Sequence, residues 1–193
     1  MARTAKKSRE TGETKIVVEV NLDGKGESSI KTQVPFFTHI LHMISKHSKI
    51  DMKIEASGDL DHHVIEDAAI VLGQAIEEAL GDKKGIYRFG NHFVAMDESL
   101  ARCVIDVSGR SYYVGDLKMV GLDIENMKAE DIEHFLITLT QNLKANLHLH
   151  VLYGINDHHK VEAAMKALAL ALRQSIAIDS VGKDAIPSTK GSL

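Results

Sequence analysis

The chain has 193 residues, of which 44% are hydrophobic and 26% are charged. These are the proportions of a globular domain, and they exclude a disordered or fibrous chain. The net charge of −4 gives no basic field of the kind that accompanies nucleic-acid binding, and no apolar run approaches the roughly 18 residues of a membrane-spanning helix. The N-terminus lacks the apolar segment of a secretory signal, and the lone Cys103 is compatible with a reducing compartment, so we expect a cytoplasmic protein.

The first half of the chain predicts a β-β-α-β-α pattern after a basic, solvated tail at residues 1–12. Alternating apolar residues predict strands and a 3.6-residue period predicts helices. The turn Asp23–Gly26 favours a hairpin between the first two strands. The predicted strands cover residues 14–22, 27–34 and 50–56, and the predicted helices begin at Pro35 and cover residues 61–80 before Gly81.

The second half repeats this order and ends in a polar tail, residues 183–193, whose composition alone is typical of disorder. The predicted strands cover residues 89–95, 100–107, 112–114 and 147–153, and the predicted helices cover residues 130–143 and 158–178. We therefore divide one functional domain into two halves, residues 13–84 and 85–182. The expected fold class is α+β, an internal duplication of two β-β-(β)-α-β-α halves, each a mixed sheet with two helices on one face, related by a pseudo-two-fold axis.

A repeated motif supports the duplication. The string Asp61–Glu66, DHHVIE, recurs 96 residues later as Asp157–Glu162, DHHKVE, at the start of the equivalent predicted helix. A further histidine precedes each copy: His39 lies 23 residues before His62, and His134 lies 24 residues before His158. The chain has 11 histidines, and histidine is the commonest metal ligand in proteins. The repeat therefore predicts two related metal sites.

Helix geometry constrains how the motif can bind metal. Residues four apart share a helix face, so His62 can chelate with Glu66 and His158 with Glu162, whereas the histidine at the next position is turned by about 100°. We assign His39, His63, His158 and Glu162 to one ion, and His62, Glu66, His134 and His159 to the other. This donor set suits Mn, Fe, Co or Zn and leaves coordination positions open for a substrate.

Neighbouring residues have less specific interpretations. Asp61, Asp67 and Asp157 can orient the ligand imidazoles, although N-capping is an equal alternative for Asp61 and Asp157. Four other histidines are expected to be ordinary surface or core residues: His42, His92, His148 and His150.

Short motifs follow one another along the chain: GET at 12–14, FFTHIL at 36–41, GD at 58–59, HHVIED at 62–67, GIYRFG at 85–90, MDE at 96–98, DVSGR at 106–110, EHF at 133–135, GINDHH at 154–159 and PSTKG at 187–191. With these motifs in this order, the chain from about Glu13 to Leu193 resembles the imidazoleglycerol-phosphate dehydratase family of histidine biosynthesis. Two departures stand out. Thr38 replaces the family's usual Asp before His39, and the loop between Asp59 and His62 is about three residues shorter than is common.

The resemblance implies a lyase that dehydrates D-erythro-imidazole glycerol phosphate to imidazole acetol phosphate. It implies two Mn²⁺ ions per active site and a 24-subunit homo-oligomer whose sites form between subunits. Glu13 is then the catalytic base and His47 contacts a substrate hydroxyl. The phosphate is expected to bind Arg88, Arg110, Lys166, Ser188 and Lys190, with the C-terminal tail closing over it.

The chemical difficulty is that the proton to be removed lies on a carbon with no neighbouring carbonyl. A metal-bound imidazolate can expel the adjacent hydroxyl, which makes the next carbon's proton acidic, and the resulting enol ketonises. The alternative is a structural or metal-storage assembly, in which loss of Glu13 changes nothing. Nucleic-acid binding is disfavoured by the net charge and the few aromatic residues.

Overall fold

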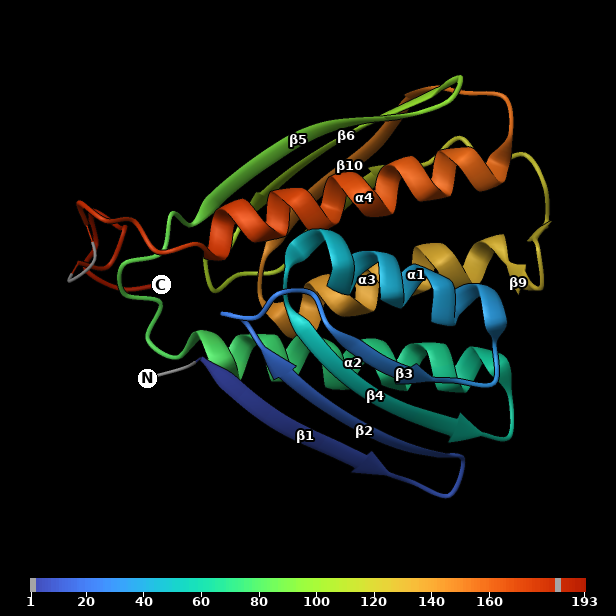
Figure 1. The fold of residues 1–193 in the computed structure, drawn as a ribbon, viewed down its shortest axis with the longest axis horizontal. Helices are drawn as coiled ribbons and strands as arrows, with labels where there is room; N and C mark the ends of the chain where they lie inside the picture. Colours follow the sequence, from blue (N-terminus) through green and yellow to red (C-terminus); the bar gives the residue numbers. More distant parts are fainter. Residues whose placement is uncertain (1–2, 183–184) are drawn as a thin grey trace.

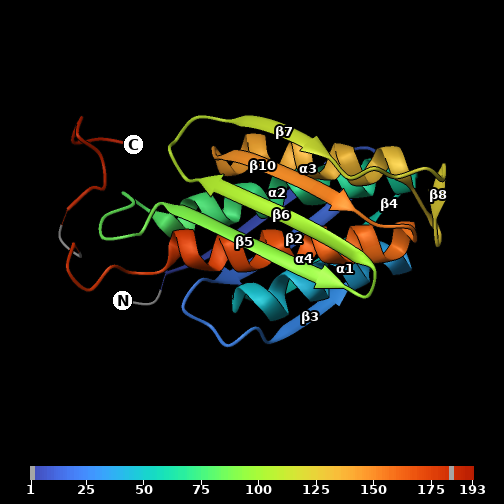
Figure 2. The ribbon, with the colours of Figure 1, turned by 90° about the horizontal axis from the view of Figure 1, so that it is seen from above.

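Two sheets enclose a layer of helices. The computed structural model describes residues 3–182 and 185–193, and in these ranges four helices lie between two four-stranded sheets (Figures 1 and 2). The first half of the chain builds one sheet and the second half builds the other. In this part of the chain, no helix is long and apolar enough to cross a membrane.

The first sheet has the strand order β1-β2-β4-β3, in which β3 and β4 are parallel and the other pairs are antiparallel. The elements of this half are β1 (Thr4–Glu10), β2 (Thr14–Asn21), β3 (Ser28–Lys31), α1 (Pro35–Ser48), β4 (Asp51–Gly58) and α2 (Asp61–Leu80). The predicted helix over 61–80 is confirmed at both ends.

The second sheet has the equivalent order β5-β6-β10-β7, again with one parallel pair at the β7 edge. The elements of this half are β5 (Phe89–Met96), β6 (Ser99–Asp106), β7 (Tyr112–Asp116), β8 (Asp123–Ile124), β9 (Met127–Lys128), α3 (Ala129–Leu143), β10 (Asn146–Tyr153) and α4 (Asp157–Ile176). Matching strand orders confirm the α+β fold of two duplicated mixed sheets.

Two sequence predictions are wrong. The hairpin between residues 14–22 and 27–34 does not form, because β4 lies between β2 and β3 and pairs with both. The segment β3-α1-β4 is a parallel crossover unit, and such pairing is set by the helix packing rather than by the local turn. Most of the predicted tail 1–12 is also structured, since β1 pairs with β2 from Thr4 to Glu10.

The two halves share one core between the sheets. α2 packs on α3 and α1 packs on α4, and the fully buried rings of Phe37 and Phe135 meet edge-to-face with centroids 5.2 Å apart. α2 and α3 approach closely at Gly73, where a Cβ would lie 2.7 Å from the Cβ of Asn142. This packing fixes the helix ends on which the repeated motifs stand.

Candidate metal centre

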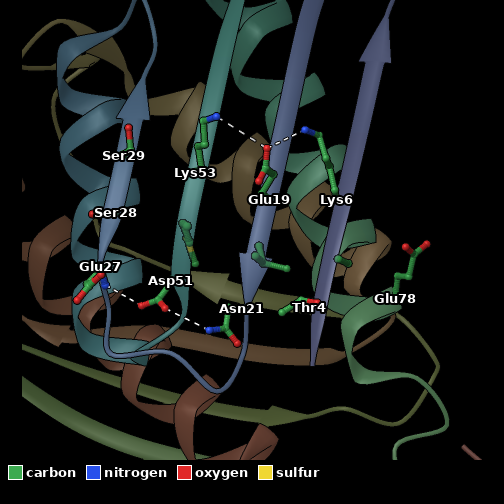
Figure 3. A pocket seen from close by; sticks show the side chains of 13 residues that line it. Thr4, Lys6, Glu19, Asn21, Glu27, Ser28, Ser29, Asp51, Lys53 and Glu78 are labelled. Carbon is green, nitrogen blue, oxygen red and sulfur yellow. Dashed lines mark hydrogen bonds and ion pairs between the residues drawn. The ribbon is translucent and has the colours of Figure 1, made fainter. Parts of the chain in front are cut away.

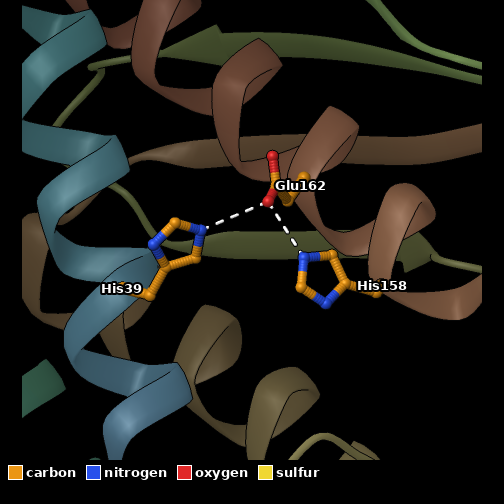
Figure 4. Close-up of side chains that lie close together, drawn as sticks. All are labelled: His39, His158 and Glu162. Carbon is orange, nitrogen blue, oxygen red and sulfur yellow. Dashed lines mark hydrogen bonds and ion pairs between the residues drawn. The ribbon is translucent and has the colours of Figure 1, made fainter.

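The first histidine cluster joins the two halves. His39 comes from α1, whereas His158 and Glu162 come from the first turns of α4, and the three side chains converge (Figure 4). The Oε1 atom of Glu162 lies 3.2 Å from Nε2 of His39 and 3.0 Å from Nε2 of His158. One atom of each residue lies within 4.8 Å of the others, so the three groups can share one ion.

The second cluster is its counterpart on α2 and α3. His62 and Glu66 belong to α2 and His134 belongs to α3, and their ligand atoms also lie within 4.8 Å of one another. Nε2 of His134 lies 3.4 Å from Oε1 of Glu66, and it is buried without a hydrogen-bond partner among the described residues. A buried nitrogen left unpaired beside a carboxylate and a second imidazole fits a divalent ion.

Carboxylates hold two of the ligand imidazoles. Nδ1 of His62 donates to Asp131 (2.6 Å) and Nδ1 of His158 donates to Glu125 (2.9 Å). A carboxylate only accepts hydrogen bonds, so it holds a proton on Nδ1 and makes Nε2 the nitrogen that would bind a metal. Sequence reasoning missed both acids. Asp131 could have been found from its spacing, since it lies three residues before His134 on the same helix. Glu125 could not, because it lies in the β8-β9 turn, which was not predicted.

The acids proposed from the sequence have other roles, which corrects that prediction. Asp61 accepts from Nε2 of Gln33 (2.8 Å), Asp67 from Nε of Arg9 (2.8 Å), and Asp157 from the backbone N–H groups of two residues, Val120 and Gly121. The capping alternative is wrong too. The N-cap of α4 is Asn156, whose side chain accepts from the N–H groups of His158 and His159, and the N-cap of α2 is Leu60.

His63 and His159 belong to neither cluster in a single chain. Nδ1 of His63 donates to Asp59 at 2.8 Å, and Nδ1 of His159 donates to Glu98 at 2.7 Å. Their rings point away from their own clusters, as the 100° rotation per residue requires. Each cluster therefore brings together three of its four predicted ligands.

One of the predicted substrate contacts, Lys166, extends the first cluster. Nζ of Lys166 lies 2.5 Å from Oε2 of Glu162, one turn along α4. Burial alone would raise the pKa of Glu162, but the Lys166 ammonium and the hydrogen bonds from His39 and His158 outweigh it and hold this pKa at about 2. Burial, followed by the charge of Lys166, lowers the pKa of His47.

Glu13 lies close to the start of α2. It is in the turn before β2, its side chain is 61% exposed, and its Oε2 is 3.8 Å from Nδ1 of His63. Its backbone oxygen accepts from the N–H of Asp59. The carboxylate is therefore available to a ligand near His63. Thr38, the departure from the family pattern, shares a hydrogen bond with the hydroxyl of Thr32 (2.8 Å).

The other predicted phosphate contacts lie together at the far end of α4. Arg88, Arg110, Ser188 and Lys190 line a cavity of about 310 Å³. The guanidinium of Arg88 donates to both oxygens of Asp106 (2.7 and 3.1 Å) and to the carbonyl of Pro187 (2.9 Å), which holds the C-terminal segment against it. Lys166 is not part of this cavity. Residues 183 and 184 of the predicted tail lie outside the described residues.

The cavity and the first cluster of one chain are far apart. The N–H of Arg88 donates to the carbonyl of Ser175, 13 residues along α4 from Glu162. At 1.5 Å per residue this is about 20 Å. A small substrate cannot reach both within one subunit.

Comparison with known proteins agrees with the geometry. Residues 32–172 match the family model described as imidazoleglycerol-phosphate dehydratase. The enzymes of that name from Chlorobaculum parvum and Methanococcoides burtonii are each 50% identical over 99% of this chain, covering 98% and 100% of their own lengths. The crystal structure of the Staphylococcus aureus enzyme has a TM-score of 0.84 at 34% identity, covering 91% of this chain and 99% of its own. The crystal structure of the Pyrococcus furiosus enzyme has a TM-score of 0.83 at 34% sequence identity, covering 97% of this chain and 100% of its own. The chain therefore belongs to the imidazoleglycerol-phosphate dehydratase family, a family of hydro-lyases of histidine biosynthesis.

Proposed function

We propose that the chain dehydrates imidazole glycerol phosphate to imidazole acetol phosphate through two divalent metal ions, with Mn²⁺ as the first choice. The observation that carries the proposal is the duplicated pair of His₂Glu clusters, each spanning two helices and each with an imidazole held by a carboxylate. Imidazole and carboxylate donors without a thiolate suit borderline to hard divalent ions.

The reaction needs a way to make the substrate's protons more acidic and a base to remove one of them. When bound, the ions supply Lewis acidity that favours the deprotonated substrate ring and so eases loss of the neighbouring hydroxyl. Glu13, exposed beside His63, is placed to take the proton from the next carbon. His47 contacts a substrate hydroxyl. Arg88, Arg110, Lys190 and Lys166 neutralise the phosphate, and Ser188 donates a hydrogen bond to it.

The same geometry favours sites shared between copies of the chain. Each cluster lacks its fourth ligand, His63 and His159 point away from their own clusters, and the phosphate cavity is about 20 Å from Glu162. A neighbouring copy can supply what one chain lacks. We therefore propose a large homo-oligomer, with 24 subunits as the family resemblance implies.

The outer faces of the two sheets support self-association. One rung across the first sheet is Lys6, Glu19 and Lys53, which form ion pairs in a hollow of about 780 Å³ (Figure 3). The rung at the same register of the second sheet is Asn91, Val104 and His148. Phe89 and Phe93 on that face are 55% and 59% exposed. Exposed aromatic rings on one sheet, where the equivalent face of the duplicated sheet carries ion pairs, are typical of a subunit contact.

Turnover of metal-stripped protein tests the proposal. Activity on imidazole glycerol phosphate is expected only after Mn²⁺ is added back, and the Glu13→Gln variant is expected to bind the metal and assemble without turning over. If about two ions bind per chain and no turnover follows, the assembly stores metal or uses it structurally, and the dehydratase proposal is wrong.

Mixing two inactive variants tests the shared sites. His158→Ala destroys a chain's own cluster, whereas His63→Ala removes only the ligand that the chain lends to a neighbour. Dissociating and reassembling the two together should restore activity, because some sites then combine an intact cluster with an intact His63. No recovery in assembled mixtures would contradict sharing of His63 between subunits.

A further inference from the structure

The duplication gives Glu13 a counterpart in the second half. Glu13 precedes Thr14, the first residue of β2, and Glu98 precedes Ser99, the first residue of β6. Thr14 packs on Gly58, where a Cβ would lie 2.9 Å from its Cγ2, and Ser99 packs on Gly154, where a Cβ would lie 2.3 Å from its Oγ.

Each of these glycines stands four residues before the first histidine of its motif, His62 or His158. Glu13 and Glu98 each immediately precede the first residue of their strand. The two glutamates are therefore equivalent positions of the ancestral half.

The two glutamates have different partners. Oε2 of Glu98 accepts from Nδ1 of His159 (2.7 Å), and its Oε1 accepts from the N–H groups of Ile155 (3.1 Å) and Asn156 (2.9 Å) and from the hydroxyl of Ser99 (3.0 Å). Four donors surround this carboxylate. Its counterpart Glu13 is 61% exposed and lies 3.8 Å from the equivalent histidine.

The residue after each glycine explains the difference. In the first half this residue is Asp59, which accepts from Nδ1 of His63 at 2.8 Å and so releases Glu13 from that role. In the second half the equivalent residue is Ile155, which has no carboxylate and is 85% exposed. The glutamate of the second half is thus the group that holds the histidine.

We propose that Glu98 is the positioning residue for His159, fixing the proton on Nδ1 so that Nε2 can bind the metal, while Asp59 does this for His63 and leaves its counterpart Glu13 free for proton transfer. This rests on the proposed function, in which His159 is a metal ligand. The Nδ1–H of His159 and the backbone N–H groups of Asn156 and Ile155 all donate to Glu98, so its carboxylate serves as an acceptor.

Glu98→Gln tests the carboxylate, which accepts from His159 through one oxygen and from Ser99, Ile155 and Asn156 through the other. If the amide nitrogen faces His159, the imidazole must move its proton to Nε2, and that nitrogen can no longer bind a metal. If the amide oxygen faces His159 instead, the amide N–H₂ is directed at three donors, those of Ser99, Ile155 and Asn156. Either arrangement weakens the support of His159.

The test is a titration of metal-free protein with Mn²⁺, followed by elemental analysis and by the change in the Mn²⁺ electron paramagnetic resonance signal. We expect one of the two classes of site in Glu98→Gln to bind about 10- to 100-fold more weakly, and the other to be unchanged. Raising the Mn²⁺ concentration should then restore turnover. Glu98→Asp, which keeps the charge but shortens the side chain, should lie between wild type and Glu98→Gln.

Two controls make the result specific. Ser99→Ala removes a donor to the same carboxylate but leaves the pair with His159, so its metal affinity should match wild type. Glu13→Gln, at the equivalent position, should abolish turnover without changing the metal affinity, and no Mn²⁺ concentration should rescue it. Thermal unfolding of each metal-free variant identifies a loss of folding.

The outcomes separate the two proposals. If wild type binds no Mn²⁺ specifically, the proposed function fails. If wild type binds about two ions per chain and Glu98→Gln binds them with unchanged affinity, the positioning role of Glu98 is wrong and the proposed function stands. If Glu98→Gln does not fold, Glu98→Asp is compared with wild type in its place. If Ser99→Ala lowers the Mn²⁺ affinity as much as Glu98→Gln does, the positioning role of Glu98 is also wrong, because the loss of affinity would then come from a change in local structure.

Discussion

Replacing Asp106 with Asn should weaken substrate binding while leaving the chemical step largely intact. Arg88 uses three of its five N–H groups within the described residues: two on Asp106 at 2.7 and 3.1 Å, and one on the Pro187 carbonyl at 2.9 Å. The remaining N–H groups are then available to the phosphate in the cavity of about 310 Å³. Asp106 therefore sets the plane of the guanidinium.

The expected magnitude follows from these contacts. An asparagine keeps one acceptor and loses one charge-assisted hydrogen bond, which is worth about 1.5–3 kcal/mol when buried. The side chains of Arg88 and Asp106 are 15% and 21% exposed, so we expect about 1–2 kcal/mol, a rise in KM of about 5- to 30-fold. kcat should change little, because Arg88 contacts the phosphate rather than the carbons that react.

The chain offers a matched control. Arg3 pairs with both oxygens of Asp23 and also donates to a backbone carbonyl, that of Ile176, but it lies outside the phosphate cavity. Steady-state kinetics of Asp23→Asn should therefore match wild type. The reasoning is refuted if both variants raise KM equally, or if Asp106→Asn lowers kcat at unchanged KM.

Three further predictions concern the fold. Phe135→Ala should lower the free energy of unfolding by about 3–5 kcal/mol in urea denaturation, because the ring is fully buried against Phe37; a loss below about 1 kcal/mol would argue against one core shared by both halves. Burial raises the pKa of Asp51, but hydrogen bonds from the Glu27 and Lys25 backbone outweigh it and leave this pKa below its ordinary value. Asp51→Asn should therefore be about 1 kcal/mol less stable at pH 7, with the difference shrinking as the pH falls below about 4; a difference independent of pH would exclude the carboxylate as its source. Burial raises the pKa of the Cys103 thiol to about 12, so it should react with a thiol reagent only after denaturation, and fast reaction of the native protein would contradict its buried position.

The helices could be predicted from the sequence, but part of the strand pairing could not. The helix over 61–80 follows from its apolar period and Gly81. β1 lacks such a signal because charged residues occupy both its faces: Lys6 pairs with Glu19 on the outer face, whereas Arg9 reaches Asp67 on α2. These contacts are tertiary, so the local sequence favoured a tail.

The clusters could be predicted because the motif occurs twice. The i, i+4 spacing placed His158 beside Glu162, and the preceding histidines His39 and His134 joined the pairs as expected. The supporting carboxylates could not be found in this way. Asp131 is 69 residues from His62 and lies in the other half, and Glu125 is 33 residues from His158 and lies in the β8-β9 turn. Only the tertiary packing brings these residues together.

The metal content of matched variants tests the central claim most directly. Wild-type protein, stripped and reloaded with Mn²⁺, should hold about two ions per chain by elemental analysis. Glu162→Gln and Glu66→Gln, which each alter the carboxylate of one cluster, should each hold about one. Two ions in both variants, or none in wild type, would contradict the assignment of the two clusters as metal sites.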